Sequence, residues 1–308
     1  MCAAPPLTRH TVFAIIEPIK EARGGERPMP QWNEQYQALC RAIAVLGPAA
    51  VAFSGGVDSS LLLRAAVDAL GKDRVIAVTV RSEAVQRREA ETAAEYCDAL
   101  GVRHFVAEFT MLDVPGIRDN PPDRCYLCKR ALFSRMLQIA GEQGFQTVLE
   151  GSNLDDDADY RPGRKALAEL GIRSPLREAG LGKAEIRAIS KRLGLPVWDK
   201  PALACLATRI AYGEQLTEEK LRAVERAEAF LLERGFRQVR VRVHGRLARI
   251  EVPTDAIKRL LELGEETAAC FRALGFVHIC VDLEGYRTGS MNETLPPEVL
   301  AQGHSNTN

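Results

Sequence analysis

The first residues with an evident capacity for chemistry form a short loop rich in glycine and serine. The loop reads Ser-Gly-Gly-Val-Asp-Ser-Ser and directly follows the apolar run from Ala49 to Phe53. At the carboxyl end of a parallel strand, glycines let backbone N–H groups turn inward, and the next helix adds partial positive charge. The serine hydroxyls can donate to phosphate oxygens, whereas Asp58 would repel them unless Mg²⁺ lies between. The predicted phosphate-binding residues are Ser54, Gly55, Gly56, Val57, Asp58, Ser59 and Ser60.

The same loop differs from two better-known phosphate motifs. It lacks the Gly-Lys-Ser/Thr ending of a Walker A loop and the glycine spacing of a dinucleotide fingerprint, which disfavours kinase-type and dehydrogenase functions. It resembles the pyrophosphatase loop of the ATP pyrophosphatase superfamily, which includes GMP synthetase, NAD synthetase and the tRNA thiolation enzymes. The resemblance implies that ATP is cleaved between its α and β phosphates, that a substrate oxygen is adenylated, and that pyrophosphate leaves. The alternative is an ordinary glycine-rich turn with serine caps.

A second polar turn falls at the end of another apolar strand. Residues 151–156 read Gly-Ser-Asn-Leu-Asp-Asp and follow a strand predicted to end at Leu149. Doubly wound sheets bind ligands at the carboxyl ends of their strands, so Gly151, Asn153 and Asp155 are expected to bind the nucleotide. The turn resembles the second nucleotide-side loop of the same superfamily. A polar turn with Asn and Asp capping chemistry is the alternative.

Three cysteines form a possible ligand set. Cys125 and Cys128 open a predicted helix, where the i, i+3 spacing places both sulfurs on one face and the helix start favours thiolates. Such a pair alone could be half of a zinc site, a redox pair or two buried thiols. Cys205 lies in a loop with small neighbours, and no His is near in sequence to complete a four-ligand zinc site. Three thiolates suit a 4Fe-4S cluster with one iron open to sulfide or substrate.

The remaining cysteines are scattered along the chain. The sequence has eight in all, which in a reducing compartment favours thiols, metal ligands or catalytic groups over a disulfide framework. Four with apolar neighbours are predicted to be packing residues: Cys40, Cys97, Cys270 and Cys280. Apolar runs near the start, such as Val12 to Ile16, are too short for a bilayer span or a signal peptide. The prediction is a cytoplasmic protein without a membrane partner.

Basic residues alternate with valines in the segment 237–244. Because strands have a period of two, Arg240 and Arg242 project from one side while the valines face the other. The next strand places Arg249 and Glu251 opposite its apolar side. One interpretation is a solvated sheet face with a cross-strand ion pair. The other is an anion site for a substrate phosphate or carboxylate, which paired arginines bind well.

The elements that position these residues alternate between strand and helix from residue 35 to about 193. This alternation predicts an α/β fold with a doubly wound parallel sheet. The predicted strands are 49–53, 75–80, 104–109 and 147–149. The predicted helices are 35–46, 59–70, 86–100, 124–143, 163–170 and 183–193.

After the Pro- and Gly-punctuated stretch 196–216 the pattern changes. A long helix at 218–234, two alternating strands within 238–252, helices to about 274 and a strand at 277–282 predict a smaller α+β domain. The predicted organisation is an N-terminal extension (1–34), an ATP pyrophosphatase domain with the cysteines (35–215), a small substrate-binding or oligomerisation domain (216–290) and a flexible tail (291–308).

Composition agrees with this organisation. A chain of 308 residues is long enough for two domains with cores of their own. Hydrophobic residues make up 46% and charged residues 27%, which is typical of globular proteins and disfavours disordered or fibrous classes. Lys plus Arg and Asp plus Glu both number 41, and this balance disfavours a nucleic-acid partner.

Together these motifs resemble the LarE family over residues 35 to 291. The resemblance rests on both loops, the Cys-Leu-Ala-Thr-Arg segment that starts at Cys205, the Arg-Val-Arg strand and the end motif Asp-Leu-Glu-Gly-Tyr-Arg-Thr-Gly-Ser at 282–290. It implies an adenine nucleotide alpha hydrolase-like fold and ATP-dependent sulfur insertion into pyridinium-3,5-biscarboxylic acid mononucleotide, a step towards the nickel-pincer nucleotide of lactate racemase. Each substrate carboxylate would be adenylated and then converted to a thiocarboxylate. The implied cofactors are ATP, Mg²⁺ and a 4Fe-4S cluster.

Family members obtain their sulfur in two ways. Some sacrifice a single cysteine, which matches Cys205, and end as dehydroalanine, whereas others hold a 4Fe-4S cluster on three cysteines, as this chain could. The resemblance makes Cys205, Asp58 and Lys129 catalytic residues, with sulfide or a sulfur donor protein as the source. It implies substrate binding by four residues: Arg209, Arg240, Arg242 and Glu251. A homo-oligomer is expected because small sheet domains of this superfamily often mediate self-association.

Two rival functions stay open at this point. A tRNA thiolase of the same superfamily can combine this loop with three cluster cysteines, although the neutral charge balance and the lack of an added RNA-binding module disfavour it. A protein that binds ATP without turnover could use the same fold. Measured pyrophosphate release would separate an enzyme from such a protein.

Overall fold

The computed structural model describes residues 31–158, 162–201 and 204–304. Residues 1–30 of the predicted N-terminal extension, and Cys2 with them, lie outside these ranges. The first described helix, α1 (Gln31–Leu46), starts four residues before the predicted domain boundary at 35. Within the described ranges, no helix combines the length and apolarity that crossing a membrane requires.

Four parallel strands form the sheet of the first part of the chain, in the order β3-β2-β1-β4. Their bounds are β1 (Ala49–Ala52), β2 (Val75–Arg81), β3 (Arg103–Glu108) and β4 (Thr147–Leu149). In the register, Ala49 pairs with Val75 on one side and with Thr147 on the other. Because the order runs outward in both directions from β1, the predicted doubly wound parallel sheet is confirmed.

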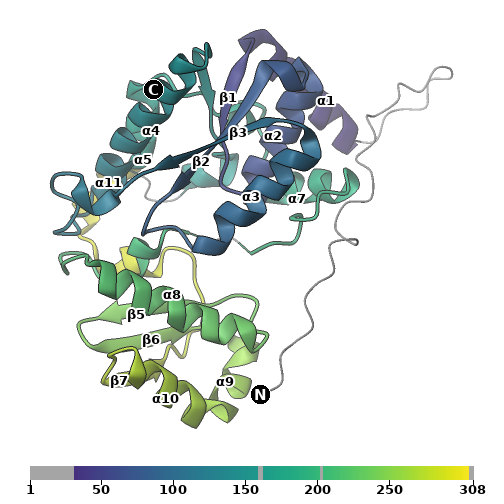
Figure 1. Cartoon of the computed structure of the whole chain (residues 1–308). Coiled ribbons are helices and arrows are strands. Elements are labelled where there is room, and N and C mark those ends of the chain that lie inside the picture. Colours follow the sequence, from purple (N-terminus) through teal and green to yellow (C-terminus); the bar gives the residue numbers. More distant parts are fainter. Residues whose placement is uncertain (1–30, 159–161, 202–203, 305–308) are drawn as a thin grey trace.

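Helices cover both faces of this sheet (Figure 1). One face packs against α1, α2 (Val57–Leu70), α3 (Arg87–Leu100), α6 (Pro175–Glu178) and α7 (Lys183–Arg192), and the other against α4 (Arg124–Glu142) and α5 (Gly163–Glu169). The alternation of side chains along a strand explains the two layers, since Ala49 and Val51 of β1 join the first core and Ala50 joins the second. Short strands that are apolar on both faces are typical of a parallel sheet buried between helices.

The second part of the chain is a three-stranded sheet with helices, drawn in green and yellow in Figure 1. Its elements are α8 (Glu218–Glu233), β5 (Arg240–His244), β6 (Leu247–Glu251), α9 (Ile257–Glu262), α10 (Gly264–Ala273) and β7 (His278–Val281). Strands β5 and β6 pair antiparallel, and β6 pairs with β7 in parallel. The predicted α+β architecture is confirmed, while the division of the chain near residue 215 stays a prediction.

One hydrophobic core joins the two parts. It contains Met111, Leu112 and Ile117 from the segment after β3, together with Leu221 of α8 and Val241 of β5, all of them buried. The two parts therefore share packed side chains and are not connected by a linker alone.

The end of the chain differs from the predicted tail. Ser290–Thr294 forms a 3₁₀ turn, and α11 (Pro297–His304) is helical. Met291 is buried, and the side chain of Asn292 accepts a hydrogen bond from the Tyr212 hydroxyl (3.0 Å). Local polarity predicted a tail because the sequence does not reveal these contacts with a segment 80 residues earlier.

Candidate active site

The phosphate loop has the strand-to-helix geometry that its sequence predicts. Gly55 has φ +71°, a backbone conformation that residues with a Cβ rarely adopt. Gly56 precedes the first turn of α2. The Ser59 hydroxyl donates to the Gly56 carbonyl (3.2 Å) and lies 3.0 Å from the Ser54 hydroxyl. The loop therefore holds its own shape and leaves the N-terminus of α2 open to an anion.

The second loop lies directly against the first. A Cβ on Gly151 would lie 3.2 Å from the Ser59 nitrogen and 3.4 Å from the Asp58 Cβ, so the absence of a side chain at Gly151 permits this approach. The Asn153 amide donates to Asp58 Oδ1 (3.4 Å). The structure thus brings Gly151 and Asn153 to the phosphate loop, as the sequence predicts.

Two residues that are predicted to bind the nucleotide, Ser60 and Asp155, make contacts within the protein. Ser60 is fully buried, and its carbonyl accepts a hydrogen bond from the Tyr96 hydroxyl, so this side chain belongs to the core behind the loop. Asp155 accepts a hydrogen bond from the backbone N–H of Lys183 (2.7 Å) at the start of α7. This contact positions α7, and the predicted role of the exposed Asp155 as a nucleotide ligand stays a prediction.

Two lysines that the sequence analysis did not single out reach the phosphate loop. The ammonium group of Lys183 contacts Asp58 Oδ2, and that of Lys200 donates to the Gly55 carbonyl (3.1 Å). Both line a cavity of about 200 Å³ together with Ser54, Asp58 and Cys205. Neither lysine lies near the loop in sequence, so no local pattern could reveal them.

The three predicted ligand cysteines lie in one neighbourhood. Burial raises the pKa of the Cys128 thiol to about 12, and the nearby Cys205 and Cys125 add to this rise while Arg124 opposes it. Burial also raises the pKa of Cys205, again opposed by Arg124. Burial of Cys128 therefore opposes the thiolate form that the sequence predicts at this helix start. No three Cys, His, Asp or Glu side chains in the described ranges are grouped so that they could hold a metal ion.

The other cysteines divide between core and surface. Cys40 and Cys97 are buried in the core of the sheet domain, as predicted. Cys270 is half-buried against the core that joins the two parts. Cys280 is exposed, because its position in β7 faces solvent, so its assignment as a packing residue is wrong.

Arg209 is fully buried and its guanidinium is occupied by protein groups. It forms two hydrogen bonds to Glu228 of α8 (2.8 and 3.2 Å) and donates to the carbonyls of Ala204 (3.0 Å) and Cys205 (3.1 Å). These contacts fix the Cys205 loop to α8. Arg209 also lines the cavity of about 270 Å³, and its predicted substrate-binding role stays a prediction.

The arginine face of β5 is buried, so the interpretation as a solvated sheet face is wrong. Arg242 donates to Glu251 (3.0 Å) and to the carbonyl of Thr208 (3.1 Å). Glu251 is 0% exposed and accepts further hydrogen bonds from Arg249 (3.1 Å) and Ser290 (2.8 Å), so it holds Arg242 and has no surface for a substrate. The predicted substrate-binding role of Glu251 is thereby corrected to a positioning one.

Arg240 and Arg242 both line a cavity of about 270 Å³. Burial, followed by the charge of Arg209, lowers the pKa of Arg240 to about 10, while Glu228 opposes the shift. Cys125 and Lys129 line the same cavity. A cavity with this lining suits an anionic ligand.

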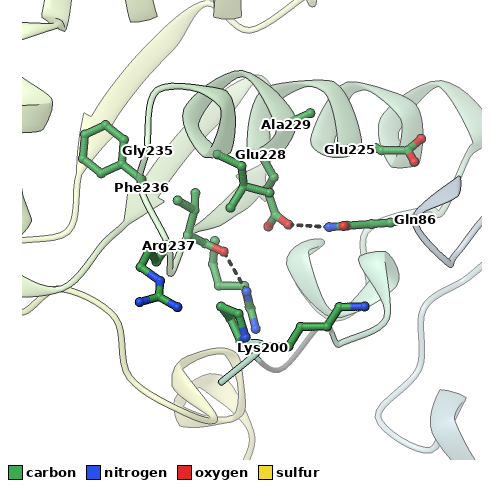
Figure 2. Close-up of a pocket in the computed structure, with 12 residues that line it drawn as sticks. Gln86, Lys200, Glu225, Glu228, Ala229, Gly235, Phe236 and Arg237 are labelled. Carbon is green, nitrogen blue, oxygen red and sulfur yellow. Dashed lines mark hydrogen bonds between the residues drawn. The ribbon is translucent and has the colours of Figure 1, made fainter. Parts of the chain in front are cut away.

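The cavities meet at the loop that carries Cys205. Ala204 lines both the phosphate-loop cavity and the arginine cavity. A third cavity of about 350 Å³ lies between α8 and the sheet domain, with Gln86 and Lys200 on its wall; Figure 2 shows the Gln86 amide directed at Glu228. The arrangement can hold a polyphosphate on one side of Cys205 and a second anion on the other.

Comparison with known proteins places this site in a family. A model of the NAD synthase family matches residues 42–113. The pyridinium-3,5-bisthiocarboxylic acid mononucleotide synthase of Lactiplantibacillus plantarum is 39% identical over 263 residues, which cover 85% of this chain and 95% of that enzyme. The chain belongs to the LarE family. An uncharacterised protein of Synechocystis is 43% identical over 266 residues, covering 85% of this chain and 98% of that protein.

A third relative extends the likeness to the archaea. An uncharacterised protein of Methanocaldococcus jannaschii is 29% identical over 238 residues, covering 77% of this chain and 90% of that protein. The resemblance drawn from the sequence motifs is thereby confirmed. The part of the chain that matches the NAD synthase model includes the Ser54 to Ser60 segment, and its predicted role as the pyrophosphatase loop stays a prediction.

Proposed function

We propose that this LarE family member uses ATP to adenylate a carboxylate of pyridinium-3,5-biscarboxylic acid mononucleotide and then converts that carboxylate to a thiocarboxylate. The observation that carries the proposal is the pair of cavities on either side of the Cys205 loop. One offers a pyrophosphatase loop to ATP, and the other offers arginines to the phosphate of a mononucleotide. A relative with the corresponding synthase name, matched over 95% of its length, supports the same substrate class.

The activation step uses the phosphate loop. A carboxylate oxygen of the substrate attacks the α-phosphorus of ATP, the bond between that phosphorus and the bridging oxygen breaks, and pyrophosphate leaves. The start of α2 lines the cavity in which the leaving group would bind, and Asp58 is the residue that would hold Mg²⁺ beside it. These groups act by stabilising charge on the departing pyrophosphate.

The arginine cavity orients the second reactant. Arg240 and Arg242 would hold the substrate phosphate, with Lys129 on the same wall. Arg242 is fixed by Glu251 and Ser290, so its guanidinium is already in place before a ligand arrives. Such preorganisation places the carboxylate near the α-phosphorus without reordering the site.

We also propose that Cys125, Cys128 and Cys205, which are not grouped closely enough to hold a metal ion in this structure, come together to bind a 4Fe-4S cluster. Cysteine thiolates are the usual ligands of such clusters, and the adjacent Arg124 favours the charged form of Cys128 and Cys205. When bound, the cluster would supply an open iron at which the sulfur for transfer is held. The sulfur would come from sulfide or from a sulfur donor protein.

The alternative source of sulfur is Cys205 itself. Its thiol would lose its proton and attack the acyl adenylate, and AMP would leave. Loss of the Cα proton of Cys205 with cleavage of its Cβ–S bond would then give the thiocarboxylate and a dehydroalanine at this position. Cys205 lines the phosphate-loop cavity, which places it on the side where the adenylate forms. The two routes differ in whether Cys125 is needed.

Product analysis tests the proposed function. Purified enzyme with ATP, Mg²⁺ and the mononucleotide should release AMP and pyrophosphate and yield a product in which sulfur replaces a carboxylate oxygen, as measured by mass spectrometry. Release of ADP and phosphate would contradict the adenylation step. Thiolation of tRNA with no change in the mononucleotide would instead support the rival thiolase function.

A further inference from the structure

Several arginines line the cavity of about 270 Å³, and Arg124 differs from the others in its partners. Arg124 is 2% exposed, and in the described part of the chain none of its partners is a carboxylate. A buried charge is normally paired, because leaving water disfavours an isolated ion. The wall of the cavity at Arg124 therefore carries a positive charge that no neighbouring carboxylate balances. Three of the other arginines form ion pairs: Arg209 with Glu228, Arg242 with Glu251 and Arg287 with Glu293.

Two neutral groups hold the guanidinium of Arg124 in place. Its Nη1 donates a hydrogen bond to the side-chain oxygen of Asn120. Its central carbon lies 5.6 Å from the centre of the Tyr212 ring, within the range of a cation–π contact. A cation that is fixed before a ligand arrives binds an anion without paying to order its own side chain.

The backbone of Asn120 supports this orientation. Asn120 is fully buried and has φ +51°, a left-handed conformation that is uncommon outside glycine and is found preferentially at functional sites. Its side-chain amide donates to the carbonyls of Ile210 (3.1 Å) and Ala211 (2.7 Å), in the segment that follows Cys205. Asn120 therefore fixes Arg124 relative to the segment that carries Cys205.

The other terminal nitrogen of Arg124 lies on the side of the cysteines. Its Nη2 is 4.0 Å from the sulfur of Cys125, a half-buried residue that lines the same cavity. The phosphate of the substrate is already assigned to Arg240 and Arg242, so a different anion is needed to balance Arg124. This anion would bind beside the sulfur of Cys125.

We propose that Arg124 forms the binding site of an anionic sulfur donor, hydrosulfide, and holds it beside Cys125. Hydrosulfide is the small anion that sulfide forms in neutral and alkaline water, and its single charge matches that of one guanidinium. The inference rests on the proposed sulfur insertion with sulfide as the source, and it names the residue that binds this source. Binding forms an ion pair and hydrogen bonds, and no covalent bond changes.

Alkylation of Cys125 by two reagents tests for the unbalanced charge. Iodoacetate is an anion and iodoacetamide is neutral, so the ratio of their rates at one thiol reports the local attraction for anions, whatever the reactivity of that thiol. On the full-length chain without metal, we expect this ratio at Cys125 to exceed that at the exposed Cys280 about tenfold, as measured by peptide mass spectrometry. Arg124→Met should abolish the difference, and Arg124→Lys should keep part of it.

Calorimetry with sodium sulfide, under anaerobic conditions and on the same metal-free chain, tests the identity of the anion. We expect Arg124→Met to raise the dissociation constant of sulfide about tenfold or more, because a charge-assisted contact is lost. The dissociation constant of the mononucleotide should change less than twofold. The matched control is Arg130→Met, at an exposed position of the same helix α4, which should bind both ligands like the wild type.

Two results would overturn the proposal. Equal alkylation ratios at Cys125 and Cys280 in the wild type would show that Arg124 attracts no anion, and this comparison needs no variant that has to fold. Weaker binding of the mononucleotide by Arg124→Met, with sulfide binding unchanged, would assign Arg124 to the substrate. These measurements contain no ATP, whereas the proposed function is contradicted by wild-type enzyme that releases no pyrophosphate, so the two failures are distinguishable.

Discussion

Arg242 combines two roles at the scale of a single residue, because it lines the arginine cavity and neutralises a buried carboxylate. Removal by Arg242→Ala would leave Glu251, which is fully buried, with Arg249 as its remaining charged partner. Breaking a buried ion pair typically costs 3–5 kcal/mol, so we expect a loss of about 3 kcal/mol in the free energy of unfolding. Urea denaturation followed by circular dichroism measures this loss.

The effect of Arg242 on substrate affinity has to be measured separately from its effect on the free energy of unfolding. Arg242→Lys keeps a charge beside Glu251 but loses the two-pronged geometry, so it should remain folded while the substrate dissociation constant rises about tenfold. Arg246→Ala, at an exposed position in the turn that follows β5, serves as the control and should change neither quantity. Unchanged substrate affinity in Arg242→Lys would assign this arginine to the fold alone.

Cys125 separates the two proposed sources of sulfur. Only the cluster route makes this residue indispensable, so Cys125→Ala should abolish sulfur transfer while ATP binding in the neighbouring cavity is retained. Anaerobic iron and sulfide analysis should show loss of the cluster in the same variant. Full transfer by Cys125→Ala together with an inactive Cys205→Ala, and dehydroalanine at position 205 of the spent wild type, would establish Cys205 as the donor.

At the scale of elements, Gly151 determines how closely the two nucleotide-side loops approach. A methyl group at this position would lie 3.2 Å from the Ser59 nitrogen, so Gly151→Ala must displace the phosphate loop by a few tenths of an ångström. Small displacements of binding groups reduce rates strongly, and we expect kcat/KM for ATP to fall about tenfold. Steady-state pyrophosphate release measures the change.

Gly141 offers a matched control in helix α4. A Cβ at Gly141 would meet no atom within 4 Å, so Gly141→Ala should leave ATP kinetics unchanged and stabilise the helix by about 0.5 kcal/mol. If Gly151→Ala and the wild type had the same kcat/KM for ATP, a small separation of the two loops would have no effect on ATP turnover.

The elements themselves could be predicted closely from the sequence. Strand β4 has the predicted bounds, and α2 starts two residues before its predicted start because the first turn includes Val57 and Asp58. Hydrophobic periodicity carries this information, since it reports which residues face a core. The pattern Gly-Gly-Val-Asp likewise predicted the turn between β1 and α2, because a strand-to-helix turn is a local structure.

The parts of the site that the sequence did not predict depend on contacts between distant segments. Lys183 meets Asp58 across 125 residues, and Arg209 is buried because Glu228 of α8 lies opposite it. A polar residue looks solvent-exposed to any local pattern, whereas its burial depends on a partner that only the tertiary structure provides. Ser60 was misplaced in the same direction, because its position in the first turns of α2 directs this polar side chain into the core.

At the scale of the whole molecule, the core around Met111 and Leu112 decides how the two parts unfold. These residues follow β3 of the sheet domain, yet they pack with Leu221 and Val241 of the second part. The buried pair of Arg209 and Glu228 ties the same regions together. An isolated second part would expose this shared apolar surface and leave Glu228 without its partner.

We therefore expect the sheet part and the second part to unfold together in a single cooperative transition. Both tryptophans, Trp32 and Trp198, belong to the sheet part, so their fluorescence reports on that part while far-ultraviolet circular dichroism reports on both. Coincident urea curves from the two probes indicate one unit. The Met111→Ala variant, which removes a buried side chain from the shared core, should shift both curves together and lower the free energy of unfolding by about 2–5 kcal/mol. Two separated transitions, or a shift confined to one probe, would show instead that the parts fold independently and that the site between them forms by docking of two finished domains.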